Sequence, residues 1–407
     1  MAASADGGLP PEPVRTVPGV RLSAVSANIR YRDRPDLVAM ELAPGSETCA
    51  VFTRNAFCAA PVEIARAHLA AARPRYLLIN AGNANAGTGA AGRRAALSCC
   101  EALARRCGVP AEQVLPFSTG VIGEALPVDR ITDALPQLTA RLDPGAWLEA
   151  AKAILTTDTR PKTAYAELNF GGKTVRIAGI AKGSGMIRPD MATMLAFVFT
   201  DAKLSRAQVD SLLREQVENS FNRITVDGDT STNDACVLTA TGAGAALGEQ
   251  DGADWESFRS ALAEVFRRLA QAIIRDAEGG SKFVTVRVSE GATSGECLQV
   301  AYAVAESPLV KTACFASDPN WGRILAAVGR AGIADLDLAG LRIYLGGAPV
   351  VADGEPHPDY SEEAGLAAMA GTDIDIDIRL GRGECRETVW TSDLSHDYVR
   401  INAEYRS

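Results

Sequence analysis

Short apolar runs that fit β-strands alternate along this chain with longer segments of helical periodicity. The clearest strand is Asp373–Leu380, where Ile374, Ile376 and Ile378 alternate with charged residues, a pattern typical of a strand with one buried face. Further strands are expected at Thr48–Thr53, Tyr76–Asn80, Tyr165–Phe170, Thr174–Ile180, Met194–Thr200, Ala235–Thr241, Phe283–Val288, Leu298–Val304 and Leu341–Leu345.

Apolar residues three and four positions apart predict several amphipathic helices. In Ser205–Ser220, Val209, Leu212, Leu213 and Val217 form one apolar stripe behind a serine N-cap. The same spacing predicts helices at Val62–Ala72, Ala90–Cys107, Trp147–Leu155, Asp254–Asp276 and Ser361–Met369. With 407 residues the chain is long enough for two or more domains. The mixture of elements favours α/β or α+β layers, with helices packed on sheets.

Composition and charge narrow the classes of function. The net charge is −9, which argues against nucleic acid as a main partner because phosphate binding needs a basic surface. No apolar run reaches the roughly 18 residues of a membrane span, and residues 1–18 lack the pattern of a targeting peptide. We therefore expect a flexible N-terminal tail on a cytoplasmic protein without a membrane partner. Nine cysteines without a C-x-x-C pair are expected to be reduced, and three scattered histidines predict no metal site.

The segment from Lys182 to Phe197 carries the most specific chemistry. It places a hydroxyl residue, Thr193, after the small Ala192, between a loop broken by Gly and Pro and an apolar strand. A hydroxyl at such a point can attack the carbonyl of its own preceding peptide bond. Hydrolysis of the resulting ester then leaves Thr193 with a free α-amine. A free α-amine has a pKa of about 7.7–8.0, so it can act as the base that activates the hydroxyl without any histidine.

Two glycine-rich segments also have alternative interpretations. A Gly-rich turn before a strand is most often only a turn. The run from Gly87 to Gly92 has the G-x-G-x-x-G spacing of a dinucleotide-binding loop. However, it does not follow its strand at once, and the acidic residues Glu101 and Glu112 are poorly placed for a ribose contact. We interpret it as a turn that opens a helix.

A series of motifs in sequence order gives the chain a family resemblance. They are Val51–Val62, Asn80–Gly87, Ser118–Gly123, Thr156–Lys162, Lys182–Leu195, Phe221–Asn233, Asp318–Arg323 and Tyr398–Tyr405. Together they resemble the ornithine acetyltransferases, or glutamate N-acetyltransferases, which are self-cleaving bifunctional enzymes of arginine biosynthesis. The resemblance covers about residues 19–407, and eight matches in order are far more specific than one.

The resemblance implies a fold and a set of chains. The fold is a layered α/β (α+β) sandwich of the self-processing, N-terminal-nucleophile-like (DOM-fold) type, with a smaller C-terminal α/β subdomain. Residues 1–18 would form a flexible tail. Cleavage between Ala192 and Thr193 would divide the rest of the sequence into an alpha chain, residues 19–192, and a beta chain, residues 193–407. Two alpha and two beta chains are expected to assemble.

The resemblance also implies roles for individual residues. Thr193 is the nucleophile, and the Thr119 hydroxyl with the Gly120 backbone N–H forms an oxyanion hole, which suits a turn where glycine lets the backbone approach closely. Lys182 can hold a substrate carboxylate as a point charge, and Glu278 can pair with the amine end of the substrate. By position, the substrate contacts also include Thr156, Thr193, Asn402 and Ser407.

Some residues depart from the usual form of the family. Arg188 and Asp190 stand in the cleavage loop where neutral residues are usual, and Ala277 stands where glycine is usual beside Glu278. Ser407 replaces the usual threonine and keeps its hydroxyl. None of these changes removes a reacting group.

The expected reaction is a ping-pong transfer of acetyl from N2-acetylornithine to glutamate through an acetyl ester of Thr193. No cofactor or metal is expected, and acetyl-CoA stays open as an alternative acetyl donor. Two other functions stay open: a self-cleaving amidohydrolase or aminopeptidase in which water resolves the acyl enzyme, and a non-catalytic module that binds a dinucleotide or another ligand.

Overall fold

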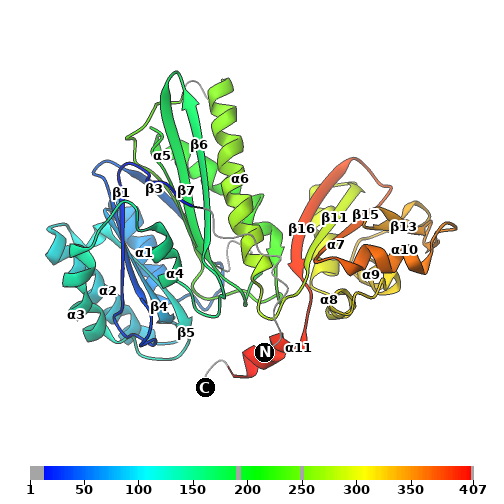
Figure 1. Ribbon diagram of the computed structural model, residues 1–407, viewed down its shortest axis with the longest axis horizontal. Coiled ribbons are helices and arrows are strands. Elements are labelled where there is room, and N and C mark those ends of the chain that lie inside the picture. Colours follow the sequence, from blue (N-terminus) through cyan, green and yellow to red (C-terminus); the bar gives the residue numbers. More distant parts are fainter. Residues whose placement is uncertain (1–12, 189–193, 248–251, 405–407) are drawn as a thin grey trace. The chain divides into compact units, whose positions relative to one another are not determined.

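The computed structural model describes residues 13–188, 194–247 and 252–404, which form two compact units (Figure 1). The larger unit comprises the described residues up to Asn222 together with Thr230–Ile273. The smaller unit comprises Arg223–Asp229 and the described residues from Ile274 onward. Ala192, Thr193 and Ser407 lie outside the described residues, so the boundary between alpha and beta chains stays a prediction.

The first sheet of the larger unit has the strand order β1-β2-β4-β5. Its strands are β1 (Val20–Val25), β2 (Leu37–Leu42), β4 (Tyr76–Asn83) and β5 (Val114–Val121). Only β4 and β5 run parallel. Every residue of β4 is buried, because Leu77 and Ile79 face one core while Tyr76 and Leu78 face another. Strands buried on both faces read as continuous apolar runs, which explains why the sequence pattern found this one.

The second sheet of the larger unit has the order β3-β10-β8-β7-β6. Its strands are β3 (Glu47–Phe52), β6 (Lys162–Phe170), β7 (Lys173–Lys182), β8 (Leu195–Thr200) and β10 (Ala235–Ala240). The two sheets share a core in which Phe197 of β8 meets Phe117 of β5 edge to face at 5.1 Å. Val17, which belongs to the predicted tail, is wholly buried in the same core.

Helices complete the layers of the larger unit. They are α1 (Ala60–Ala71), α2 (Gly89–Cys107), α3 (Val128–Ala140), α4 (Trp147–Ala153), α5 (Arg206–Glu218) and α6 (Ala253–Arg275), the last of which ends in the smaller unit. Helices α2 and α3 pack on the first sheet through Cys99, Leu103 and Leu135. Helix α6 lies so close to β7 that a Cβ at Gly179 would come within 2.7 Å of Leu269 Cδ1.

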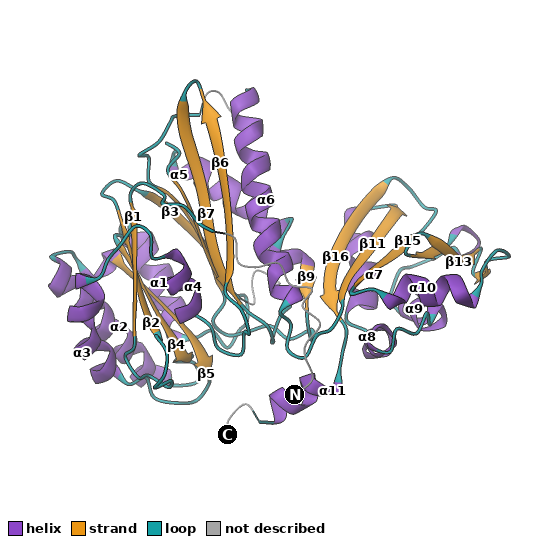
Figure 2. Ribbon diagram, viewed as in Figure 1, coloured by secondary structure: helices purple, strands orange, loops and turns teal. Residues whose placement is uncertain are grey.

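The smaller unit is one sheet with helices packed on it (Figure 2). The strand order is β14-β13-β12-β15-β11-β16-β9. The strands are β9 (Ile224–Thr225), β11 (Phe283–Gly291), β12 (Arg342–Leu345), β13 (Ala348–Ala352), β14 (Glu355–Pro356), β15 (Asp373–Arg379) and β16 (Cys385–Ser392). The helices are α7 (Ser294–Ala305), α8 (Pro308–Phe315), α9 (Trp321–Gly329), α10 (Glu362–Ala370) and α11 (His396–Ala403).

Strand β15 has the alternation that the sequence predicts. Ile374, Ile376 and Ile378 are buried in the core of the smaller unit. On the outer face, Asp375 and Asp377 form ion pairs with Arg287 of the neighbouring β11 at 2.8 and 3.2 Å. The layered α/β fold with a smaller C-terminal α/β subdomain is thus confirmed.

The strand expected at Leu298–Val304 is wrong, because these residues belong to α7. Val300 and Val304 favour a strand by their branched side chains. However, the buried residues Cys297, Val300, Ala301 and Val304 follow helical spacing. Thr293 caps the helix by accepting a hydrogen bond from the Glu296 N–H at 3.1 Å, so the Thr-x-x-Glu sequence was the signal for a helix start.

The cysteines and the hydrophobicity of the helices bear on two expectations drawn from the composition. All nine cysteines are free, and six of them are buried, as expected for reduced residues of a large core. Within the described ranges, no helix combines the length and hydrophobicity that crossing a bilayer requires.

Candidate functional site

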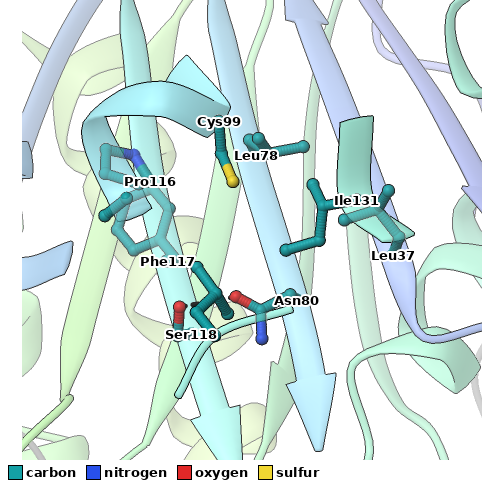
Figure 3. Close-up of a pocket in the computed structure, with 10 residues that line it drawn as sticks. Leu37, Leu78, Asn80, Cys99, Pro116, Phe117, Ser118 and Ile131 are labelled. Carbon is teal, nitrogen blue, oxygen red and sulfur yellow. Dashed lines mark hydrogen bonds between the residues drawn. The ribbon is translucent and has the colours of Figure 1, made fainter. Parts of the chain in front are cut away.

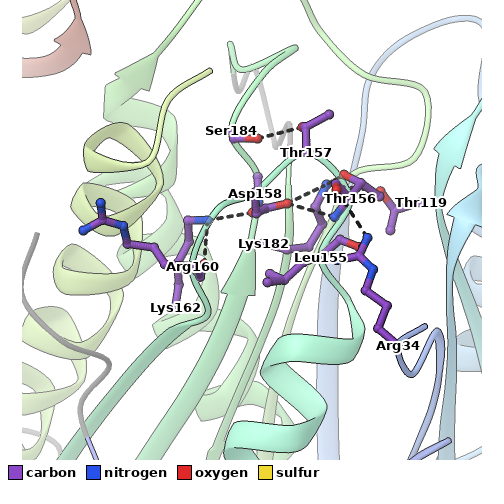
Figure 4. Close-up of polar contacts among 11 residues, drawn as sticks. Arg34, Thr119, Leu155, Thr156, Thr157, Asp158, Arg160, Lys162, Lys182 and Ser184 are labelled. Carbon is purple, nitrogen blue, oxygen red and sulfur yellow. Dashed lines mark hydrogen bonds and ion pairs between the residues drawn. The ribbon is translucent and has the colours of Figure 1, made fainter. Parts of the chain in front are cut away.

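Three predicted site residues meet in the larger unit at the ends of different elements (Figure 4). Thr119 lies in β5, Thr156 follows α4, and Lys182 is the last residue of β7. The Lys182 ammonium donates hydrogen bonds to Thr156 Oγ1 at 3.0 Å and to Thr119 Oγ1 at 3.2 Å. Because both hydroxyl oxygens accept from Lys182, each hydroxyl proton must point away from the lysine, and each is available to donate elsewhere.

A buried carboxylate, Asp158, ties this group together. Its Oδ1 accepts hydrogen bonds from the Gly183 N–H and from Lys162 Nζ, both at 2.6 Å. Its Oδ2 accepts from the Thr156 N–H at 3.1 Å and lies 3.8 Å from Lys182 Nζ. Burial by itself would raise the pKa of Asp158, but the charges of Lys162 and Lys182 and the hydrogen bonds hold that pKa below its usual value. Asp158 is therefore ionised at neutral pH.

Gly120 lies in β5 rather than in the expected turn, and its backbone conformation is possible only with glycine. Gly120 has φ +131°, and a Cβ there would lie 2.2 Å from the carbonyl carbon of Gly82 and 2.6 Å from the Asn83 nitrogen. The neighbouring strand β4 has a register shift at Gly82 and Asn83. The backbones of β4 and β5 therefore approach each other too closely for any side chain.

Buried amide side chains hold this end of β5 in place. Asn233 Nδ2 donates to the carbonyl oxygens of Ser118 at 3.0 Å and Ala84 at 2.6 Å. Ser118 Oγ donates to Asn80 Oδ1 at 2.6 Å, and Asn80 Nδ2 donates to the Asn83 carbonyl at 2.8 Å. Figure 3 shows Asn80 and Ser118 beside a small cavity of about 10 Å³ lined otherwise by apolar side chains. Such a network fixes the path of the backbone that carries Thr119 and Gly120.

The smaller unit brings together two other predicted residues. Asn402 of α11 donates from Nδ2 to Glu278 Oε2 at 2.9 Å. The segment beside Glu278 is held by Ser395, whose Oγ donates to the Gly279 carbonyl at 2.6 Å. Gly279 has φ +66°, and a Cβ there would lie 2.4 Å from the Tyr398 nitrogen. The close packing of Gly279 against α11 therefore orients Glu278 toward Asn402.

Sequence reasoning missed Asp158, Lys162, Asn80 and Asn233, although all four lie within motifs that it quoted. No local signal existed for Asp158, because its carboxylate accepts the N–H of Thr156, two residues earlier, whereas an Asx turn uses an N–H two residues later. No local signal existed for Asn233, since its partners Ala84 and Ser118 are more than a hundred residues away in the sequence.

The glycine-rich run at Gly87–Gly92 has a structural explanation. Helix α2 begins at Gly89. A Cβ at Gly92 would come within 1.8 Å of Thr88 Oγ1 and 2.5 Å of Asn85 Oδ1, and Asn85 Nδ2 donates to the Gly92 carbonyl at 2.9 Å. The glycine makes room for side chains that pack against the first turn of the helix. This packing supports the interpretation of the run as a turn and a helix start.

Comparisons with known proteins agree with the family resemblance. A sequence model of the ArgJ family matches residues 21–407. The arginine biosynthesis bifunctional protein ArgJ of Psychrobacter arcticus is 54% identical over 399 residues, which are 98% of this chain and 98% of that protein. The protein of the same name from Pseudomonas syringae pv. tomato is 53% identical over 403 residues, which are 98% of this chain and 99% of that protein. A crystal structure of ArgJ from Bacillus halodurans is 38% identical with a TM-score of 0.50, over 52% of this chain and 100% of the solved chain.

Proposed function

Because the chain belongs to the ArgJ family, we propose that it transfers the acetyl group of N2-acetylornithine to glutamate through an ester on Thr193. The family match confirms the resemblance seen in the sequence and, with it, an enzyme of the acetyltransferase class that serves arginine biosynthesis. The observation that carries the proposed mechanism is the contact of the Lys182 ammonium with the hydroxyls of Thr119 and Thr156.

The nucleophile is made by cleavage of the bond between Ala192 and Thr193. The described residues around this bond support the assignment, because Lys182 of β7 pairs with Leu195 of β8 in antiparallel register. The Met194 carbonyl accepts a hydrogen bond from the Ala235 N–H at 2.9 Å, so the residue directly after Thr193 is anchored to the second sheet. Leu195, two residues after Thr193 in the sequence, therefore lies beside Lys182, which itself contacts Thr119.

The solved relative is consistent with such a cleavage. The chain from Bacillus halodurans is covered completely, yet it corresponds to only 52% of this chain. Residues 193–407 make up a similar share of the 407 residues. A single fragment of a cleaved enzyme would produce this relation.

In the proposed reaction, Thr193 Oγ attacks the carbonyl carbon of the N-acetyl group while the Thr193 α-amine takes the hydroxyl proton. The negative oxygen that forms is stabilised by the Thr119 hydroxyl and the Gly120 N–H. The C–N bond then breaks, and the proton passes to the departing amine of ornithine. An acetyl ester remains on Thr193. The glutamate amine attacks the carbonyl carbon of this ester, the bond from that carbon to Thr193 Oγ breaks, and N-acetylglutamate leaves. The proton of the amine returns to Thr193 Oγ through the α-amine.

The remaining residues hold the two amino-acid substrates. Lys182 binds a carboxylate with Thr156 beside it, and Glu278 binds an amine with Asn402, while Ser407 belongs to the same proposed set. The chemistry requires no cofactor or metal, and acetyl-CoA remains an alternative acetyl donor. Assembly of two alpha and two beta chains and a cytoplasmic location stay predictions.

Dependence on glutamate separates acetyl transfer from hydrolysis. With N-acetylornithine and catalytic amounts of enzyme, we expect sustained release of ornithine only when glutamate is present, since its amine must resolve the ester. Ornithine is measured by chromatography, with leucine in place of glutamate as the control acceptor. Equal release without glutamate would instead favour the self-cleaving amidohydrolase, in which water resolves the ester.

A further inference from the structure

A buried ion pair lies beside the proposed carboxylate-binding lysine. The side chain of Asp158 is fully buried and that of Lys162 is 1% exposed, and their charged atoms are 2.6 Å apart. Lys162 is the first residue of β6 and also donates to the Arg160 carbonyl at 3.4 Å. Buried ion pairs seldom stabilise a fold more than apolar residues of the same size would. Stability alone therefore gives little reason for placing two charges at this point.

Among the described residues, Asp158 forms ion pairs with two lysines, Lys162 and Lys182, at unequal distances. Lys162 Nζ is 2.6 Å from Asp158, whereas Lys182 Nζ is 3.8 Å away. The side chain of Lys182 keeps 12% of its surface exposed. Lys162 thus neutralises the carboxylate, and the net positive charge of these three groups resides on Lys182, the lysine that reaches the hydroxyls of Thr119 and Thr156.

We propose that Asp158 and Lys162 are positioning residues that keep the positive charge of Lys182 available for the carboxylate of the substrate. This inference rests on the proposed role of Lys182. Asp158 is fixed by the N–H groups of Thr156 and Gly183, so it cannot follow Lys182. Without Lys162, the carboxylate would draw Lys182 into direct contact, cancel its charge, and move its ammonium away from the two hydroxyls.

The test compares ligands that differ only in the carboxylate charge. Ornithine and its α-amide, ornithinamide, are titrated by calorimetry into the purified full-length protein without an acetyl donor, so that no reaction occurs. The wild type is expected to prefer ornithine by about tenfold or more, the scale of one charge contact near a protein surface. Lys162→Met should abolish most of this preference by letting Asp158 neutralise Lys182.

The double variant Lys162→Met with Asp158→Asn should recover the preference, because both neighbouring charges are removed and Lys182 is again uncompensated. The asparagine side chain introduced by Asp158→Asn retains a carbonyl oxygen that can accept the Gly183 N–H. Recovery of ligand preference in a doubly altered protein is not expected from two residues with merely structural roles. Lys173→Met, at the exposed opposite end of β7, removes the same charge far from the site and should leave the preference unchanged.

The possible results separate failure of the positioning role from failure of the proposed function. Preference that is equal in the wild type, Lys162→Met and the double variant would overturn the positioning role. Lys182→Met should also lose the preference, and if it does not, the proposed carboxylate role of Lys182 fails. A wild type that binds ornithine with the expected charge dependence but transfers no acetyl group would refute the proposed reaction and leave the positioning role standing.

Discussion

Replacement of Thr193 by alanine is expected to give one uncut chain of 42.7 kDa with no detectable acetyl transfer. The methyl group of alanine cannot attack the preceding carbonyl, so the ester that precedes cleavage never forms. The same change removes the nucleophile of the reaction and, because the bond stays intact, the α-amine that serves as its base. Loss of a nucleophile that works with its base typically lowers kcat on the order of 10⁶-fold. Gel electrophoresis under denaturing conditions and an ornithine-release assay measure the two effects.

Thr193→Ser is the matched control for this variant. Serine keeps a hydroxyl at the same position, so we expect two fragments and measurable, although slower, transfer. Two fragments from Thr193→Ala would show that another residue cuts the chain. Normal acetyl transfer by an uncut chain would rule out the α-amine as the base.

Gly120→Ala is expected to lower kcat by about 10²–10³-fold, the usual effect of losing one oxyanion-hole donor. The added Cβ would meet the Gly82 carbonyl carbon at 2.2 Å. Because this atom belongs to the backbone, no side-chain rotation can relieve the contact, and the end of β5 must move. The Gly120 N–H and the Thr119 hydroxyl would then no longer point at the place where negative charge develops. Steady-state kinetics with saturating substrates measure the loss.

Gly123→Ala provides the matched control, just after the end of β5. Gly123 also has a positive φ, +86°, but a Cβ there meets no atom within 4 Å. Gly123→Ala therefore measures the effect of a side chain at a positive φ without a steric clash. If the Gly120 N–H stabilises the transition state, the kcat of Gly123→Ala should stay within about threefold of the wild-type value. Similar kcat values for the two variants would remove Gly120 from the oxyanion hole.

The fold was most predictable where one local pattern decided the structure. Strand β15 follows from strict alternation of isoleucine with charged residues, and its outer face is indeed charged. Helix α5 follows from its serine cap and apolar stripe, and the capping box at Ser205 is present. Residues 298–304 were misassigned because alanine and valine fit both periods, so burial on a neighbouring sheet decided between them.

The candidate site was predictable only through motifs, and only in part. Lys182 is 63 residues from Thr119 and 26 from Thr156 in the sequence, so no local pattern could bring them together. The resemblance supplied these residues without the contacts between them. Asp158 and Lys162 escaped notice because the role of a buried charge depends on its neighbours in space, which become visible only in the folded chain.

In the proposed mechanism Thr193, freed by cleavage, carries the acetyl group. Intact-mass spectrometry of the purified protein, before and after incubation with N-acetylornithine in the absence of glutamate, tests it most directly. We predict two fragments that join between Ala192 and Thr193, with about 42 Da added to the C-terminal fragment, as an acetyl ester requires, and lost again when glutamate is supplied. An intact chain that turns over substrate, or an acetyl group on the N-terminal fragment, would contradict it.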